Sequence, residues 1–267
     1  MYNTLIMTAE RGMFNSKSVL VTGAASGFGY ETVQKFSQYP HKFNPIYAAD
    51  INSSICDIFE QDSHQHVIPL KFDVRDPKQI ANIVDRMIDK TGKVDVLVNN
   101  AGVINAGRLQ TYFFQDGMPT PQLRELYETN LAGPILLMNA VLRHMRVQRD
   151  GVIINVTSAA PHNRTPLRIP YTDYKAGTDE IEAVAVQRLY DWWRKHLGGD
   201  PKNVAEAIYR ITEGELTNHR VIVGLDSQLT TFMHEHIPFW NEIFEIGFDA
   251  VVFPIKVAVR IEQMRKK

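Results

Sequence analysis

The chain has 267 residues, of which 44% are hydrophobic and 22% charged, and its formal net charge at pH 7 is −1. This length suits one large α/β domain or two small ones, and it can bury a sizeable core without a disulfide or a structural metal. The nearly balanced charge gives no electrostatic reason to expect a nucleic-acid partner. Cys56 is the single cysteine, which excludes an intramolecular disulfide and a cysteine-cluster metal site and favours a reducing, cytoplasmic location.

The two ends of the chain differ from its middle. Residues 1–15 lack the basic start and the continuous apolar run of a signal peptide, so we interpret them as a loose N-terminal extension. The sequence has no run of about 18 apolar residues, and no membrane span is expected. Residues 246–260 are apolar with interspersed charges and precede a basic end. We interpret them as a segment packed on the domain or on a neighbouring subunit, with peripheral contact to a membrane surface as the alternative.

Apolar, β-rich runs alternate with segments of helical spacing along the chain. The expected strands are residues 17–23, 45–51, 67–74, 94–100, 151–158 and 220–226. The expected helices are residues 27–38, a segment starting at Asp76-Pro77, residues 121–148, a segment starting near Pro170, and residues 201–212. Strands separated by helices predict a parallel sheet with right-handed crossovers and helices on both faces. Such sheets bind ligands at the carboxyl ends of the strands, where the strand order reverses.

The first expected strand runs into a glycine-rich turn, in which residues 22–29 read TGAASGFG. Glycine at this junction allows a tight turn and lets a phosphate approach the backbone, while the next helix offers unpaired N–H groups and the positive end of its dipole. The spacing alone also fits an ordinary glycine-rich turn. At the first strand–helix junction of a βαβ pattern it predicts a dinucleotide site. The candidate cofactor-binding residues of this turn are Thr22, Gly23, Ser26, Gly27, Phe28 and Gly29.

Asp50 ends the second expected strand and is followed by Ile51, a further cofactor candidate. A carboxylate here can accept hydrogen bonds from both hydroxyls of an adenosine ribose. It would repel the 2′-phosphate of NADP, since two like charges about 4 Å apart, at an effective dielectric near 20, cost on the order of 4 kcal/mol before relaxation. The pattern therefore favours NAD over NADP, with a helix-capping or turn aspartate as the alternative interpretation.

Several more motifs follow in order along the chain. They are Asp73-Val74 at the end of the third expected strand, Asn99-Asn100-Ala101-Gly102 after the fourth, Asn130 inside the long helix, and Ser158 ahead of Tyr171-x-x-x-Lys175. Together with the spacing of the glycine turn, these motifs resemble the short-chain dehydrogenase/reductase family over residues 17–188 and about 201–226.

The resemblance implies a single Rossmann-like, doubly wound parallel sheet and an NAD-dependent oxidoreductase. It also implies that family members' usual assembly, a homodimer or homotetramer, applies to this chain. The cofactor candidates that it adds are Asp73, Val74, Asn100, Ala101, Gly102, Tyr171 and Lys175.

Tyr171 and Lys175 are four residues apart, so on a helix their side chains share one face. A free tyrosine has a pKa near 10, which a neighbouring ammonium and a nicotinamide cation would both lower. Tyr171 could then take the proton of a substrate hydroxyl, or donate one in reduction, while Ser158 holds the substrate oxygen. Lys175 would also bind the nicotinamide ribose, and Asn130, by resemblance, would hold a water in a proton relay. Taken alone, Tyr171 and Lys175 would instead fit a surface pair on an amphipathic helix.

The sequence departs from the family pattern after this helix. Family members normally continue with a sixth strand ending in Pro-Gly and a substrate lid. Here residues 176–187 have a helical pattern, residues 188–215 hold no strand-like run, and the chain contains no Pro-Gly dipeptide. Two explanations stay open. A mobile segment near residues 186–191 is missing from the sequence, or the strand and lid are truly deleted and the nicotinamide pocket is more open.

The resulting hypothesis is an enzyme that transfers hydride between NAD and a secondary alcohol or ketone. The apolar segments after Tyr171 favour a hydrophobic small-molecule substrate. The catalytic candidates are Asn130, Ser158, Tyr171 and Lys175. An NAD(H)-binding sensor with impaired catalysis and an NADP-linked reductase of the same fold are the alternatives.

We expect the chain to divide into an N-terminal extension (residues 1–15), one catalytic domain (16–235) and an apolar, basic tail (236–267). The histidine pairs at 64/66 and 234/236 lack the spacing of metal ligands, so a metal site is not expected.

Overall fold

The computed structural model describes residues 16–60, 66–104, 114–157 and 200–216. These residues fall into two compact units. The first holds residues 16–102, 127–157 and 201–216, and the second holds 103–104, 114–126 and 200.

A five-stranded parallel sheet forms the centre of the first unit. Its strands are β1 (Lys17–Thr22), β2 (Phe43–Asp50), β3 (Val67–Lys71), β4 (Val96–Asn99) and β7 (Val152–Asn155), in the spatial order β3-β2-β1-β4-β7. The chain moves outward from β1 to β3 and then returns to the other side of β1 with β4. The strand order therefore reverses between β1 and β4, which is where doubly wound sheets bind ligands. The predicted parallel sheet is confirmed.

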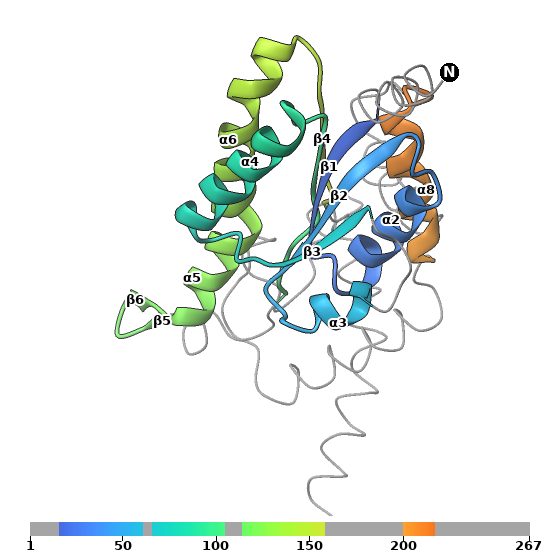
Figure 1. Ribbon diagram of the computed structural model, residues 1–267. Helices are drawn as coiled ribbons and strands as arrows, with labels where there is room; N and C mark the ends of the chain where they lie inside the picture. The colour runs from blue at the N-terminus through green and yellow to red at the C-terminus, as the bar shows by residue number, and fades with distance from the viewer. Residues whose placement is uncertain (1–15, 61–65, 105–113, 158–199, 217–267) are drawn as a thin grey trace, which may run out of the picture. The chain divides into compact units, whose positions relative to one another are not determined.

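Helices cover both faces of this sheet (Figure 1). On one face lie α2 (Gly27–Ser37) and α8 (Pro201–Thr212), and on the other lie α4 (Pro77–Thr91) and α6 (Gly133–Gln148). The short helix α3 (Ile55–Glu60) connects β2 to β3. The first unit is thus the three-layered, Rossmann-like arrangement that the alternating pattern predicts.

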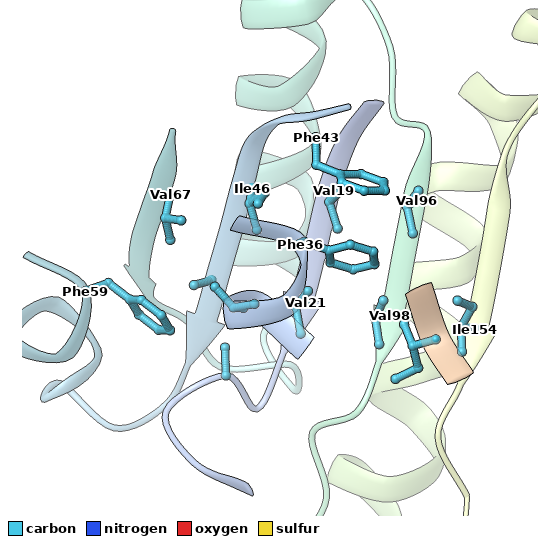
Figure 2. Packing of buried hydrophobic residues seen from close by; sticks show 14 of the residues in the cluster. Val19, Val21, Phe36, Phe43, Ile46, Phe59, Val67, Val96, Val98 and Ile154 are labelled. Carbon is cyan, nitrogen blue, oxygen red and sulfur yellow. The ribbon is translucent and has the colours of Figure 1, made fainter. Parts of the chain in front are cut away.

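The two faces of the sheet carry separate hydrophobic cores, because successive side chains of a strand point to opposite faces. Val19 and Val21 of β1 pack with Phe36 of α2 and Ile208 of α8, and Figure 2 shows most of this cluster. Leu20, between the two valines, packs on the other face with residues of α4 and α6. Each fully buried side chain of this size contributes about 1.5–3 kcal/mol.

Asp76 caps α4 as its Asp-Pro sequence predicts. Its Oδ1 accepts hydrogen bonds from the backbone N–H of Lys78 (2.8 Å) and Gln79 (3.4 Å). These bonds lower the pKa of Asp76. Gly92 ends the helix in the left-handed conformation, with a φ of 72°.

Glu213, directly after α8, ties this helix to the start of the sheet. It forms ion pairs with Lys17 of β1 (Nζ to Oε1, 3.3 Å) and with Lys42 ahead of β2. Burial alone would raise the pKa of Glu213, but the hydrogen bonds from the two lysines outweigh burial and hold the pKa below its ordinary value. The Lys17 ammonium also donates to the carbonyl of Thr212 (2.7 Å).

The long helix expected from residue 121 to 148 is interrupted. Its first part is α5 (Pro121–Tyr127), which continues into a π-helical turn, η2 (Glu128–Ala132), and then into α6. Within the π turn the N–H of Gly133 donates to the carbonyl of Glu128, five residues earlier. Such single π turns often mark functional positions, and this one contains Asn130.

In the second unit, a β-hairpin that the sequence analysis does not predict precedes α5. Strands β5 (Phe114–Gln115) and β6 (Met118–Pro119) pair antiparallel. They are joined by Asp116 and Gly117, whose φ values are 50° and 76°. Positive φ at both central residues is the signature of a type I′ turn, for which Asp-Gly is a preferred sequence.

Several expectations lie outside the described residues. They are the N-terminal extension, the helix near residue 170, the strand at 220–226, the tail from residue 236, and the segment in which a sixth strand and lid would be sought. Among the helices that are described, none has the length and apolar character needed to span a membrane.

Candidate active site

The glycine turn between β1 and α2 is packed too closely for larger residues at two positions. A Cβ on Gly29 would lie 2.1 Å from the carbonyl oxygen of Gly23. A Cβ on Gly23, whose φ is +67°, would lie 2.8 Å from Cα of Ala101. Glycine is therefore required at both positions, since such contacts are far inside van der Waals distance.

The N-terminus of α2 faces solvent at this turn. Ser26, its N-cap residue, is exposed and makes no side-chain capping bond. The first turn of the helix contains no acidic residue. Backbone N–H groups and the positive end of the helix dipole are thus available to an anion, and the geometry fits a dinucleotide pyrophosphate.

Asp50 lies beside the turn, at the carboxyl end of β2. Its Oδ2 accepts a hydrogen bond from the backbone N–H of Ala25 (2.9 Å), and its Oδ1 accepts one from Asn52 (2.9 Å). Each carboxylate oxygen retains a further lone pair for a ribose hydroxyl. The contact with Ala25 fixes the carboxylate against the glycine turn.

Two apolar side chains flank these polar groups. Phe28, in the turn, is 40% exposed, and Ile51, after Asp50, is 56% exposed. Exposed large apolar side chains beside a turn that offers free backbone N–H groups suit a ligand that combines phosphates with flat rings.

Thr22 connects the end of β1 to the segment that follows β4. Its Oγ1 accepts hydrogen bonds from the backbone N–H of Asn100 and of Ala101, each at 3.1 Å, and donates to the carbonyl of Val98 (3.3 Å). The Asn100 amide returns two bonds, to the carbonyls of Thr22 (2.9 Å) and Gly23 (3.2 Å). These bonds hold the loop after β1 and the loop after β4 together, at the place where the strand order reverses.

Asp73 and Val74, both cofactor candidates, have close protein partners. Arg75 donates to both carboxylate oxygens of Asp73, with Nε–Oδ1 at 3.0 Å and Nη2–Oδ2 at 2.8 Å, and lowers the pKa of Asp73. Val74 is buried against the start of α6, where a Cβ on Gly133 would lie 2.9 Å from the Val74 carbonyl oxygen.

Asn130 lies close to the Asn-Asn-Ala-Gly segment. A Cβ on Gly102 would lie 3.3 Å from Oδ1 of Asn130, so the small residue leaves room for this amide. The π turn and the segment after β4 thus bring a catalytic candidate to the same end of the sheet as the cofactor candidates. Among the residues that the structure describes, no group of three or more His, Cys, Asp or Glu side chains could hold a metal ion.

Residues 17–192 match the family model of the short chain dehydrogenases. The chain belongs to this family. The match covers more than half of the sequence and includes the glycine turn, Asp50 and the Tyr-x-x-x-Lys motif.

Curated relatives of this short-chain dehydrogenase agree with the family match. A 3-oxoacyl-(acyl-carrier-protein) reductase of Thermotoga maritima is 31% identical over 186 residues, covering 68% of this chain and 69% of that protein. A 2,3-dihydro-2,3-dihydroxybenzoate dehydrogenase of Escherichia coli is 30% identical over 173 residues, covering 65% of this chain and 62% of that protein. The alignments thus leave about a third of each relative unmatched.

A solved structure shows the same fold. A short-chain dehydrogenase from Streptomyces avermitilis superposes with a TM-score of 0.65 at 20% sequence identity, covering 93% of this chain and 97% of that one. At this identity the similarity supports the Rossmann-like fold of the present short-chain dehydrogenase and nothing finer.

Three of the four catalytic candidates of this short-chain dehydrogenase lie outside the described residues. They are Ser158, Tyr171 and Lys175, so their expected geometry stays a prediction. Asn155 was missed by the sequence analysis. Its Oδ1 accepts a hydrogen bond from Nδ2 of Asn99 (2.9 Å), which joins the carboxyl ends of β4 and β7. A polar residue within the apolar run GVIINVTS was the available signal.

Proposed function

We propose that this short-chain dehydrogenase is an NAD-dependent oxidoreductase that interconverts a secondary alcohol and a ketone. The observation that carries the proposal is the Asp50 carboxylate, held against the glycine turn by the N–H of Ala25 at 2.9 Å. A fixed carboxylate at this place suits the two free hydroxyls of the adenosine ribose of NAD. The 2′-phosphate of NADP would bring a second negative charge to the same position.

The residues present fit a bound nicotinamide dinucleotide. The solvent-facing N-terminus of α2 would hold the pyrophosphate, Asp50 the adenosine ribose, and Phe28 and Ile51 would contact the apolar parts. We propose that Asp73, Val74 and the Asn100–Gly102 segment complete this binding surface. When bound, the nicotinamide supplies the acceptor or donor of hydride.

The chain's own residues would carry the proton. We propose that Tyr171 takes the proton from the substrate hydroxyl in oxidation and returns one in reduction, with Lys175 favouring the phenolate. Ser158 would hold the substrate oxygen, and Asn130 in the π turn would position a water between Lys175 and solvent. The apolar segments after Tyr171 support a hydrophobic alcohol or ketone as substrate.

Self-association is part of the proposal. Leu131, Ile135 and Leu142 lie exposed on η2 and α6. Exposed apolar side chains grouped on one helix support a homodimer or homotetramer. Light scattering of the full chain behind a sizing column measures this assembly directly.

A sensor of NAD(H) with impaired catalysis is the second candidate. It is favoured by the absence of a Pro-Gly dipeptide from the sequence, since family members use that segment to cover the nicotinamide. Tyr171→Phe distinguishes the two functions. An enzyme loses nearly all turnover while it keeps its affinity for NADH, whereas a sensor has no turnover to lose and keeps its NADH-dependent response.

The first experiment is a titration of the full chain with NADH and, separately, with NADPH, following nicotinamide fluorescence. We expect NADH to bind at least about tenfold more tightly, which corresponds to a third of the charge repulsion estimated at Asp50. Asp50→Ala should remove this preference, and Asp57→Ala, at an exposed aspartate of α3, should not. Equal binding of both cofactors by the unaltered chain, or no effect of Asp50→Ala, would contradict the NAD assignment.

A further inference from the structure

A hollow of about 270 Å³ lies between the edge strand β3 and helix α4. Its apolar lining is formed by Leu70, Phe72 and Ile83, of which Phe72 and Ile83 are buried. Its charged lining is formed by Lys71, Lys78 and Arg86. We call it the cationic hollow. None of the residues that line it belongs to the glycine turn or to the Asp50–Ile51 pair.

The cations of the hollow converge from two elements. Lys78, Asn82 and Arg86 follow one another at intervals of four residues on α4, so they lie along one face of the helix. Lys71 is the last residue of β3. Three positive groups and two side-chain amides, Gln79 and Asn82, therefore surround a single apolar depression.

None of these three cations forms an ion pair within the described residues, unlike several other basic residues of the first unit. Lys17, Lys42, Arg75 and Lys93 each form an ion pair. Within the described residues, none of Lys71, Lys78 and Arg86 has a carboxylate within ion-pair distance. The Asp76 carboxylate at the start of α4 interacts with Lys78, and a bound anion would offset the remaining repulsion among the three cations.

Arg86 is an exposed residue of α4, and its side chain lines the hollow. The phenol of Tyr47, on the neighbouring strand β2, is buried, and burial raises its pKa while the charge of Arg86 works against that increase. The exposed guanidinium is therefore a solvent-accessible cation at the wall of the hollow.

We propose that the cationic hollow binds a phosphate monoester that carries a small apolar group. A guanidinium can donate two hydrogen bonds to one phosphate, and the two ammonium groups add point charges around it. The floor of Leu70, Phe72 and Ile83 would cover the apolar part of the ligand. The lining includes none of the proposed cofactor residues, although Phe72 directly precedes Asp73, and the proposal does not depend on which cofactor the chain uses.

The test is calorimetric titration of the full chain with 1-naphthyl phosphate at moderate ionic strength. 1-Naphthol and inorganic phosphate, which carry the apolar part and the charge separately, serve as comparison ligands. We expect saturable binding of one 1-naphthyl phosphate per chain, about tenfold or more tighter than binding of either comparison ligand.

Substitutions inside and outside the cationic hollow test whether the ligand binds there. Arg86→Gln and Lys71→Gln should each weaken it about tenfold, the effect of removing one charge-assisted hydrogen bond. Lys90→Gln is the matched control, because Lys90 is an exposed lysine of the same helix outside the hollow, and it should leave the affinity unchanged. Circular dichroism checks that the exposed substitutions leave the fold intact.

Three results would overturn the proposal. They are the absence of saturable binding, equal weakening by Lys90→Gln, and displacement of 1-naphthyl phosphate by NADH. Displacement by NADH would place the probe in the cofactor site. Failure of NADH to bind, with retained binding of 1-naphthyl phosphate that depends on Arg86, would contradict the proposed function and leave the cationic hollow standing.

Discussion

Oδ2 of Asp50 lies 2.9 Å from the backbone nitrogen of Ala25 and accepts its hydrogen bond. A second bond joins the same two segments, from the N–H of Ala24 to the carbonyl of Ala49 (3.1 Å). The end of β2 and the glycine turn are therefore fixed to each other before any ligand binds. The expected ribose-binding and phosphate-binding groups share one rigid frame, so less ordering is required on binding.

Asp50→Asn separates the charge of this residue from its structural role. An asparagine oxygen can still accept the hydrogen bond of Ala25, while the exposed N–H of Asn52 loses its acceptor and can bond to water instead. We therefore expect the free energy of unfolding to change by less than about 1 kcal/mol. The loss of charge removes the repulsion toward a 2′-phosphate. The ratio of NADPH to NADH affinity should rise about tenfold. Fluorescence titration with both cofactors and urea unfolding measure the two effects.

Asp50→Ala is the contrasting variant, because it removes both the charge and the acceptor. Its unfolding free energy should fall by about 1–2 kcal/mol, since the Ala25 N–H loses its partner. Equal stability of the two variants would show that the contact with Ala25 contributes nothing.

Gly29→Ala should be far more damaging than Gly27→Ala. A methyl group on Gly29 would meet the Gly23 carbonyl oxygen at 2.1 Å, and this oxygen belongs to backbone that cannot move freely. We expect a loss of about 3 kcal/mol or more in unfolding free energy, together with the loss of NADH binding.

Gly27 is the matched comparison within the same turn. Its φ is +55°, but a Cβ there would have no atom within 4 Å. The cost is limited to the left-handed backbone, about 1 kcal/mol. Urea unfolding of the two variants tests the difference, and similar losses in both would contradict the close packing at Gly29.

Thr22→Val should destabilise the chain although the side chain keeps its shape. The hydroxyl accepts the N–H groups of Asn100 and Ala101, and Thr22 is only 1% exposed. The substitution leaves both N–H groups without their acceptor. Each unsatisfied buried donor lowers the free energy of unfolding by about 1–3 kcal/mol before relaxation. Thr22→Ser keeps the hydroxyl and should cost less. A valine variant as stable as the serine variant would show that the two N–H groups find other partners.

Elements that are determined by residues adjacent in the sequence were predicted from those residues. Asp76 caps α4 because Asp-Pro supplies both the acceptor and the fixed φ at the first turn. The order of motifs along alternating strands and helices predicted that Gly23, Asp50 and Asn100 would lie at the carboxyl ends of neighbouring strands, and the sheet order brings them there.

Some features depend on contacts between residues far apart in the chain, or on small differences in backbone geometry. These features could not be predicted from the sequence. The pairing of Glu213 with Lys17 joins residues almost 200 positions apart, and the residue pattern carries no sign of it. The π turn around Asn130 has the same apolar spacing as an α-helix over one turn, so an unbroken helix was expected. The strand predicted to reach Val74 ends at Lys71, because the N–H of Asp73 bonds to the side chain of Gln79 (2.9 Å).

The ion pair between Asp73 and Arg75 predicts a pH-dependent contribution to stability. Arg75 lowers the pKa of Asp73 in the folded chain, chiefly through its side-chain hydrogen bonds. A carboxylate with a lowered folded-state pKa stabilises the fold above its unfolded pKa, near 3.9, and that stabilisation is lost as the pH falls through the folded value. Arg75→Gln should therefore cost up to about 1 kcal/mol at pH 7, since both side chains are partly exposed, and progressively less below about pH 4.

Urea unfolding of the unaltered chain and of Arg75→Gln, at neutral pH and in steps below pH 4, measures this difference. Arg146→Gln is the control, because Arg146 lies exposed on α6 and forms no ion pair with a described residue. Its effect should be small and independent of pH. A cost of Arg75→Gln that persists unchanged in acid would mean that Arg75 stabilises the loop through its apolar stem or other contacts, and not through the charge of Asp73.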